Sequence, residues 1–151
     1  MTHLSYASGA ADTGLLGITI GDMLDRTVAQ HGANEAIVVR HQGIRWTYAE
    51  FGGRVDALAR ALMALGVARG DRVGMWSTNR AEWTLTQFAT SKIGAVLVNV
   101  NPSYQASELE YALNQSGCRY LILTDVFKTT NYNEILESVA PEIRTGAAGA
   151  L

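Results

Sequence analysis

The sequence has few of the residues on which small secreted domains and nucleic-acid-binding domains depend. It contains one cysteine, Cys118, and two prolines among 151 residues. A single cysteine excludes an internal disulfide, so nothing indicates an oxidising compartment, and we interpret Cys118 as a buried, inert thiol. The formal charge is −2, with both signs spread along the chain, so there is no basic stripe that would neutralise a phosphate backbone. Nucleic acid is therefore not expected as a partner.

Long apolar runs and targeting signals are also missing. No apolar stretch approaches the roughly 18 residues that a bilayer-spanning helix needs, so no transmembrane segment is predicted. The opening residues MTHLSYASGAADTG contain neither lysine nor arginine and are not typical of a signal or transit peptide. We expect residues 1–14 to be a disordered terminus, residues 15–151 to form one domain, and the protein to be cytoplasmic.

What the sequence does contain is an alternation of strand and helix signals. Four short apolar runs are typical of strands, namely AIVVR, RVGMWS, AVLVNV and YLILTD. The last three are nearly continuous apolar runs, as expected for parallel strands that are covered on both faces. The order from residue 72 to residue 125 predicts an α/β fold with a β-α-β-α-β unit, part of a doubly wound parallel sheet with helices on both faces.

Five helix starts are predicted from capping boxes, in which a small polar side chain is followed three positions later by an acidic one. They are Thr19 with Asp22, Thr47 with Glu50, Asn79 with Glu82, Ser107 with Glu110, and Asn131 with Glu134. In the helix after Thr47, one apolar stripe is expected to face the core, and Gly66 to provide a left-handed carboxyl end; the stripe consists of Phe51, Val55, Leu58, Leu62 and Leu65. Before this helix, Gln42-Gly43 between two short strands suggests an antiparallel hairpin on an edge.

Ligand binding is expected at the loops that follow the three parallel strands, because such sheets bind ligands at the carboxyl ends of their strands. These loops are STN, NPSYQA and TDVFKTTNY. The second begins abruptly because Pro102 cannot donate to a strand ladder. No nucleotide-binding loop of the type G-x-G-x-x-G or G-x-x-x-x-G-K-[ST] occurs, no G-x-S-x-G elbow occurs, and the three histidines lack metal-ligand spacing.

The two lysines of the chain receive different interpretations. Lys92 lies near the end of a predicted helix, where its charge suits the helix dipole, and a structural role is favoured. Lys128 follows the third parallel strand and precedes the helix start at Asn131, a place suited to anions. A solvated surface lysine is the alternative for Lys128.

Three linked pieces of sequence carry a resemblance to a known family. They are TYAEF at a helix start, LGVARGDRV leading into the first parallel strand, and GAVLVNVNPSYQASELEYALNQSG. In this order and spacing, from about Thr19 to Glu142, they resemble the amino-terminal portion of acyl-CoA synthetases, members of the adenylate-forming (AMP-binding) superfamily. The VNVNPSYQ segment looks more like the branch that activates medium- and long-chain fatty acids than like the acetate or amino-acid branches.

The resemblance implies a two-step reaction, in which a fatty acid and ATP give an acyl-adenylate and pyrophosphate, and the thiol of coenzyme A then displaces AMP. It implies ATP, Mg²⁺ and coenzyme A as cofactors of the complete enzyme, and a contact between Lys128 and the 3′-phosphate of coenzyme A. The family's phosphate loop, acidic metal ligand and catalytic lysine have no counterpart in these residues. The 151 residues are therefore expected to be the first part of such an enzyme, with no catalytic residue of their own and no activity alone.

Two alternatives from other classes stay open. The chain could be a free-standing α/β module that binds a small molecule at the strand ends, although the missing glycine-rich loop counts against this. It could also be an interaction fragment that pairs with a separately encoded remainder or with itself. A sheet that ends after three strands leaves unpaired edges, which promote association.

Overall fold

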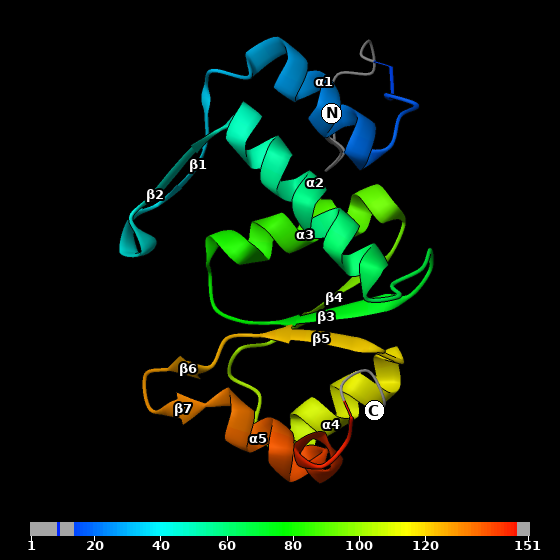
Figure 1. Ribbon diagram of the computed structural model, residues 1–151, viewed down its shortest axis with the longest axis vertical. Coiled ribbons are helices and arrows are strands. Elements are labelled where there is room, and N and C mark those ends of the chain that lie inside the picture. Colours follow the sequence, from blue (N-terminus) through cyan, green and yellow to red (C-terminus); the bar gives the residue numbers. More distant parts are fainter. Residues whose placement is uncertain (1–8, 10–13, 148–151) are drawn as a thin grey trace, which may run out of the picture.

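A three-stranded parallel sheet lies at the centre of the computed structural model, which describes residue 9 and residues 14–147. The strand order is β4-β3-β5, with both neighbours parallel to β3 (Figure 1). The strands are β3 (Arg72–Trp76), β4 (Val96–Val100) and β5 (Tyr120–Leu123). This confirms the predicted β-α-β-α-β unit. The predicted disordered terminus falls almost entirely on residues 1–8 and 10–13, which lie outside the described residues.

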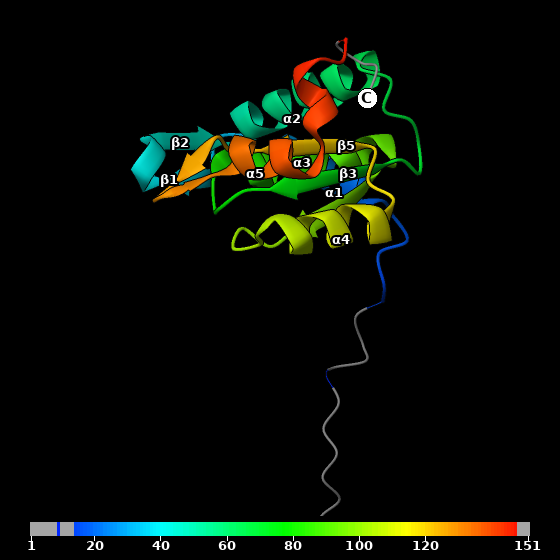
Figure 2. The ribbon, with the colours of Figure 1, turned by 90° about the horizontal axis from the view of Figure 1, so that it is seen from below.

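Helices cover both faces of this sheet, as predicted. Figure 1 shows a stack of helices on one side of the sheet and further helices on the other side. Figure 2 views the molecule from below, with α4 and α5 nearest the viewer. The stack consists of α1 (Ile20–His31), α2 (Tyr48–Ala64) and α3 (Ala81–Ile93). The opposite side of the sheet carries α4 (Ala106–Ser116) and α5 (Tyr132–Val139), and the short helix η2 (Pro141–Arg144) follows α5. None of the helices in the described part of the chain is long and apolar enough to cross a bilayer.

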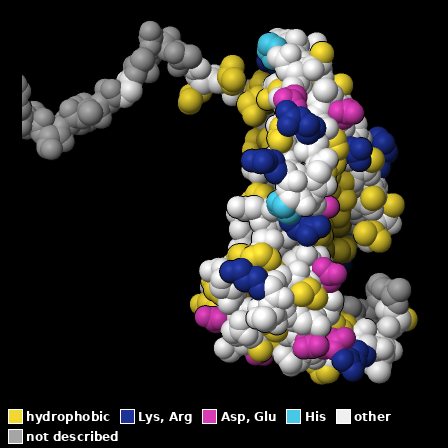
Figure 3. All heavy atoms as spheres, turned by 90° about the vertical axis from the view of Figure 1, so that its left-hand side faces the viewer, with side chains coloured by type: hydrophobic (Ala, Val, Ile, Leu, Met, Phe, Trp, Pro, Cys, Tyr) yellow, Lys and Arg dark blue, Asp and Glu magenta, His cyan; other side chains and the backbone are white. Residues whose placement is uncertain are grey.

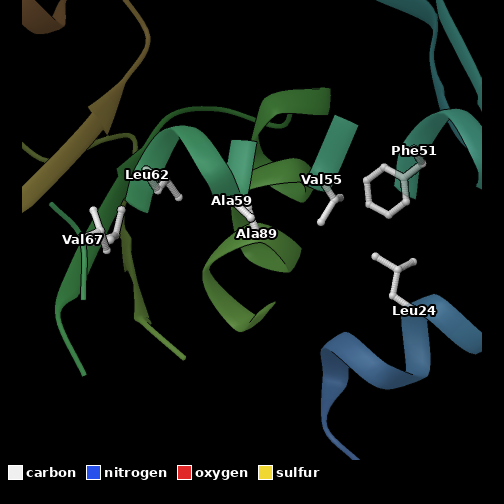
Figure 4. Packing of buried hydrophobic residues seen from close by; sticks show 8 residues of the cluster. Leu24, Phe51, Val55, Ala59, Leu62, Val67 and Ala89 are labelled. Atoms are coloured by element: carbon white, nitrogen blue, oxygen red, sulfur yellow. The ribbon is translucent and has the colours of Figure 1, made fainter. Parts of the chain in front are cut away.

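The larger core lies among the three stacked helices and the sheet (Figure 4). Leu24 from α1 meets Phe51 and Val55 from α2, and Phe51 packs edge-on against Phe88 of α3 at 5.4 Å between ring centroids. The predicted stripe is confirmed except at Leu65, which is 72% exposed. The helix ends at Ala64, and Gly66, at φ 90°, redirects the chain so that Val67 is buried instead.

A smaller core lies on the opposite face of the sheet, under α4 and α5. Its fully buried members are Trp76, Val100, Leu109 and Tyr132. The rings of Trp76 and Tyr132 form a T-shaped pair with 4.4 Å between centroids. Edge-to-face contacts of this kind add to the free energy gained by burying the two rings.

Three of the five predicted helix starts are confirmed. Thr19 and Thr47 form complete capping boxes, and the Asn131 side chain accepts from the amides of the first turn of α5. The other two are wrong by one or two positions. The N-cap residue of α3 is Arg80 and not Asn79. The N-cap residue of α4 is Gln105, whose backbone amide donates to Glu108 at 2.9 Å. Ser107 is thus the second residue of α4 and not its cap.

Two hairpins accompany the parallel sheet. β1 (Glu35–Val39) and β2 (Ile44–Thr47) are antiparallel, as predicted, but they form a separate two-stranded sheet and not an edge of the parallel one. Their connection is also longer than two residues, since a 3-10 turn at Arg40–Gln42 precedes Gly43, which lies at φ 66°. A second hairpin, β6 (Val126–Phe127) with β7 (Thr130–Asn131), was not predicted.

Candidate functional site at the carboxyl edge of the sheet

The carboxyl ends of the three parallel strands lie on one side of the molecule, at the left in Figure 1. Both hairpins project on that same side. Figure 3 looks onto this side, where lysine and arginine side chains are prominent over the upper part. The predicted ligand-binding loops therefore share one edge with two hairpins.

A shallow hollow of about 370 Å³ lies where β3 and β5 end. Its floor is apolar, from Met75, Ile122 and Leu123, and its rim is polar. The rim residues are Ser77, Arg80, Glu82, Thr124 and Asp125. A hollow with an apolar floor and a few polar groups suits a small organic ligand.

The loop after β4, at Asn101-Pro102, is held against the rest of the sheet by the smaller core. The indole Nε1 of Trp76 donates to the carbonyl of Asn101 at 3.0 Å, and the hydroxyl of Tyr132 donates to the carbonyl of Pro102 at 2.9 Å. The Asn101 side chain accepts from the amide of Ser103 at 2.9 Å and closes the turn locally. The carbonyls of Asn101 and Pro102, which directly follow β4, are thus bound by side chains from β3 and α5.

A side chain distant in sequence caps the start of α3. The Oε1 atom of Gln42, in the turn of the first hairpin, accepts from the amide of Ala81 at 2.8 Å. Its Nε2 atom donates to Glu82 Oε2 at 2.8 Å, and Arg80 Nε lies 3.5 Å from the same carboxylate. Partial burial alone would raise the pKa of Glu82, but the hydrogen bond from Gln42 and the charge of Arg80 lower it below its usual range. Sequence reasoning missed Gln42, since no local pattern links it to Ala81, which is 39 positions away. It also missed Arg80, because the helix start was predicted at Asn79.

Lys128 occupies the tip of the unpredicted β6–β7 hairpin. It is the only residue other than glycine with a positive φ in the described part of the chain, at 54°. Its Nζ lies 5.3 Å from the centroid of the Phe127 ring, and it does not line the hollow at the ends of β3 and β5. The first amides of α5 already donate to the Asn131 side chain.

Lys92 has a structural position, as predicted, whereas Cys118 is less buried than predicted. Lys92 Nζ on α3 contacts Asp25 of α1 at 2.5 Å and Asp56 of α2 at 2.6 Å, and so joins the three stacked helices. Its partial burial alone would lower the pKa of Lys92, but the hydrogen bonds that it donates to both aspartates raise it. Cys118 is half-buried, and burial raises the pKa of its thiol, which makes the reactive thiolate scarcer.

A metal site needs several ligand side chains that converge on one point. Among residues 9 and 14–147, no group of three or more His, Cys, Asp or Glu side chains converges closely enough to hold a metal ion. These residues therefore do not fit a Mg²⁺ site, and we assign none of them to that ion. What the edge does present is a wall of loops and the hollow at the ends of β3 and β5.

Comparison with known families gives a match over most of the chain. Residues 24–148 match the model of the AMP-binding enzyme family. This chain belongs to the AMP-binding enzyme family.

Individual members of the AMP-binding family show which of their portions this chain matches. The mouse (Mus musculus) protein named medium-chain acyl-CoA ligase ACSF2, mitochondrial, is 43% identical over 148 residues, which are 98% of this chain and 24% of that protein. A Mycobacterium tuberculosis fatty acyl CoA synthetase has a TM-score of 0.69 at 29% identity, over 84% of this chain and 23% of its own. The amino-terminal subdomain of Klebsiella oxytoca NpsA, in complex with anthranilyl-AMSN, has a TM-score of 0.67 at 27% identity. The match covers 75% of this chain and 29% of the NpsA chain. The chain thus spans about a quarter of the length of its curated relatives, and it matches their amino-terminal portion.

Proposed function

We propose that this chain serves as the amino-terminal part of a fatty-acyl-CoA ligase that acts on medium- or long-chain fatty acids. The observation that carries the proposal is the 43% identity to a medium-chain acyl-CoA ligase along 98% of the chain. The reaction proceeds in two steps. A fatty-acid carboxylate oxygen attacks the α-phosphate of ATP with loss of pyrophosphate, and the thiol of coenzyme A then attacks the acyl carbon and releases AMP.

The contribution of these residues to the reaction is positioning. The loop at Asn101-Pro102 is fixed by Trp76 and Tyr132, and it forms a rigid wall at the edge where the strands end. Rigid placement of substrates lowers the entropic part of a reaction barrier. ATP, Mg²⁺ and coenzyme A are the cofactors of the complete ligase in this proposal, and the groups that stabilise the triphosphate of ATP come from outside the described residues.

The proposal predicts that the 151-residue chain does not activate fatty acids alone. The purified chain, supplied with ATP, Mg²⁺, coenzyme A and octanoate or palmitate, should release no pyrophosphate above the rate without fatty acid. The same assay on the complete ligase from the native source is the positive control. Fatty-acid-dependent pyrophosphate release by the isolated chain would contradict the assignment of a positioning role.

The size of the native polypeptide separates this proposal from its alternatives. An antibody against this segment, combined with intact mass spectrometry and cell fractionation, should detect a cytoplasmic protein several-fold larger than 16.3 kDa. A native mass near 16.3 kDa would instead favour a complementing chain or a free-standing binding module. Recovery of the protein in an organelle or membrane fraction would contradict the cytoplasmic location.

We also propose that Lys128 contacts the 3′-phosphate of coenzyme A in the complete ligase. Its position supports this, because the hairpin that carries it follows β5 at the edge where the strands end. Lys128→Gln in the complete ligase should raise the KM for coenzyme A about fivefold, as for loss of one partly solvated charged contact. The KM for ATP should not change. Arg119→Gln, which removes an exposed cation at the other end of β5, is the matched control, and equal effects of the two variants would contradict the role of Lys128.

A further inference from the structure

A second hollow lies between the turn of the first hairpin and the start of α3. Its volume is about 330 Å³, and its lining differs from that of the hollow at the ends of β3 and β5. Three of its lining residues carry basic side chains, Arg40, His41 and Arg80. The other lining residues are Val38, Val39, Asn79, Trp83 and Thr84. No acidic side chain lines it.

The basic side chains of this hollow are incompletely neutralised. Within residues 9 and 14–147, Arg40 and His41 form no ion pair, and Arg80 lies 3.5 Å from Glu82, on the rim of the neighbouring hollow. Arginine guanidinium groups match the geometry of phosphate oxygens and bind them through paired hydrogen bonds. The amide of Asn79 and the hydroxyl of Thr84 add uncharged polar groups beside them.

The hollow is also built from fixed parts. Gln42, the residue after His41, binds both the amide of Ala81 and the carboxylate of Glu82, so the hairpin turn is fastened to the start of α3. Arg40 and His41 are therefore held opposite Arg80, and they are not carried on a free loop. Val38, Val39 and the ring of Trp83 provide an apolar wall next to the charges.

From these contacts we infer that the hollow between the first hairpin and α3 binds a small phosphorylated molecule. Its phosphate lies between Arg40 and Arg80, and its carbon part rests against Trp83 and the two valines. This inference does not depend on ligase activity, because the hollow is formed entirely by residues 38–41 and 79–84. A binding measurement on the chain therefore tests it separately from the proposed function.

Amide chemical shifts of the ¹⁵N-labelled chain, titrated with phenyl phosphate, test the inference. Shifts should saturate in the millimolar range and cluster at residues 38–42 and 79–84, and inorganic phosphate should bind more weakly because it lacks an apolar part. Phenol, without the phosphate, should produce no saturable shifts. Sodium chloride at matched ionic strength is the blank.

Variants of the same hairpin make the test specific. Arg40→Gln should weaken phenyl phosphate binding about tenfold, as expected for the loss of a charged hydrogen-bond donor to phosphate. Arg45→Gln is the matched control, since Arg45 lies on β2 and pairs with Glu35 outside the hollow. The inference is overturned if no saturation occurs up to about 10 mM, if shifts cluster at Ser77 and Thr124, or if both variants bind equally well.

Discussion

Trp76 and Tyr132 show how two buried side chains hold the turn that follows a strand. Both are fully buried, both use their polar atom to bind a carbonyl of the Asn101-Pro102 segment, and their rings pack on each other. The sequence predicted the end of the strand from Pro102, but not the partners of the carbonyls. Those partners lie 25 and 30 residues away.

Removal of the Tyr132 hydroxyl should destabilise the fold. Tyr132→Phe keeps the ring but leaves the Pro102 carbonyl without its donor, and we expect a loss of about 1 kcal/mol in the free energy of unfolding, measured with urea. Tyr111→Phe, at a side chain that is 68% exposed, is the control and should change stability by less than about 0.5 kcal/mol. Equal effects of the two variants would contradict a role for the Pro102 hydrogen bond.

The difference in the free energy of unfolding between wild type and Tyr132→Phe should depend on pH, because the phenol of Tyr132 is buried. Burial raises the pKa of Tyr132 above its usual value of 10.0. A folded-state pKa above the unfolded one means that the stabilisation is fully present below pH 10 and is lost as pH rises through the folded-state pKa. The difference between wild type and Tyr132→Phe should thus be the same at pH 7 and pH 9, and it should shrink only at more alkaline pH.

Gly74 marks a close approach within the central strand. A Cβ atom at this position would lie 2.8 Å from Cys118 Sγ and 2.9 Å from a methyl carbon of Leu121. Gly74→Ala should therefore destabilise the chain by about 1–3 kcal/mol, the usual cost of overpacking, in a urea titration. In a Cys118→Ala background the same substitution should cost less, because one of the two clashing atoms is gone. Strictly additive effects would show that Cys118 does not limit the space at Gly74.

At the scale of elements, most helix starts that depend on local signals were predicted correctly, whereas the one that depends on a distant contact was not. The boxes at Thr19 and Thr47 were predicted correctly because each helix start is satisfied within four residues. The start of α3 was wrong because its cap comes from Gln42 on a different element. The β6–β7 hairpin was missed since strands of two residues are too short to show an alternating pattern.

The contact between Gln42 and α3 predicts a stability loss that depends on pH. Gln42→Ala removes both the cap on Ala81 and the donor to Glu82, and we expect a loss of about 1 kcal/mol at pH 7. The pKa of Glu82 is lowered, so the stabilisation from its carboxylate is present above its unfolded value of 4.5 and is lost as pH falls through the folded-state value. The difference between wild type and Gln42→Ala in urea titrations should therefore be smaller at pH 3 than at pH 7.

The variant Gln42→Glu is the matched control for that prediction. It keeps an acceptor for the amide of Ala81 but places a second carboxylate next to Glu82. It should be less stable than wild type at pH 7 and approach wild type as pH falls towards 3, because protonation of the carboxylates weakens their repulsion. A Gln42→Ala effect that does not change between pH 7 and pH 3 would contradict a contribution from Glu82.

At the scale of the whole molecule, the fold has the same form as the amino-terminal portion of much longer ligases. Helices cover both faces of the parallel sheet. In the described part of the chain, however, β4 and β5 each pair only with β3. The sequence predicted this arrangement because each β-α-β unit is local and right-handed. It could not predict the two hollows, which depend on contacts between a hairpin and a helix that are far apart in the chain.

The open strand edges predict that the isolated chain associates with itself. Val96, at the start of edge strand β4, is 49% exposed, and Met63 and Leu65 are exposed at the end of α2. Unpaired edge strands with apolar side chains promote pairing between molecules, and a charge on the edge opposes it. Light scattering at increasing concentration should give a mass above 16.3 kDa, and Val96→Lys should lower it towards the monomer value. Tyr111→Lys, on the exposed side of α4, is the control and should not lower the mass. A wild type that is monomeric at every concentration would show that these edges are protected.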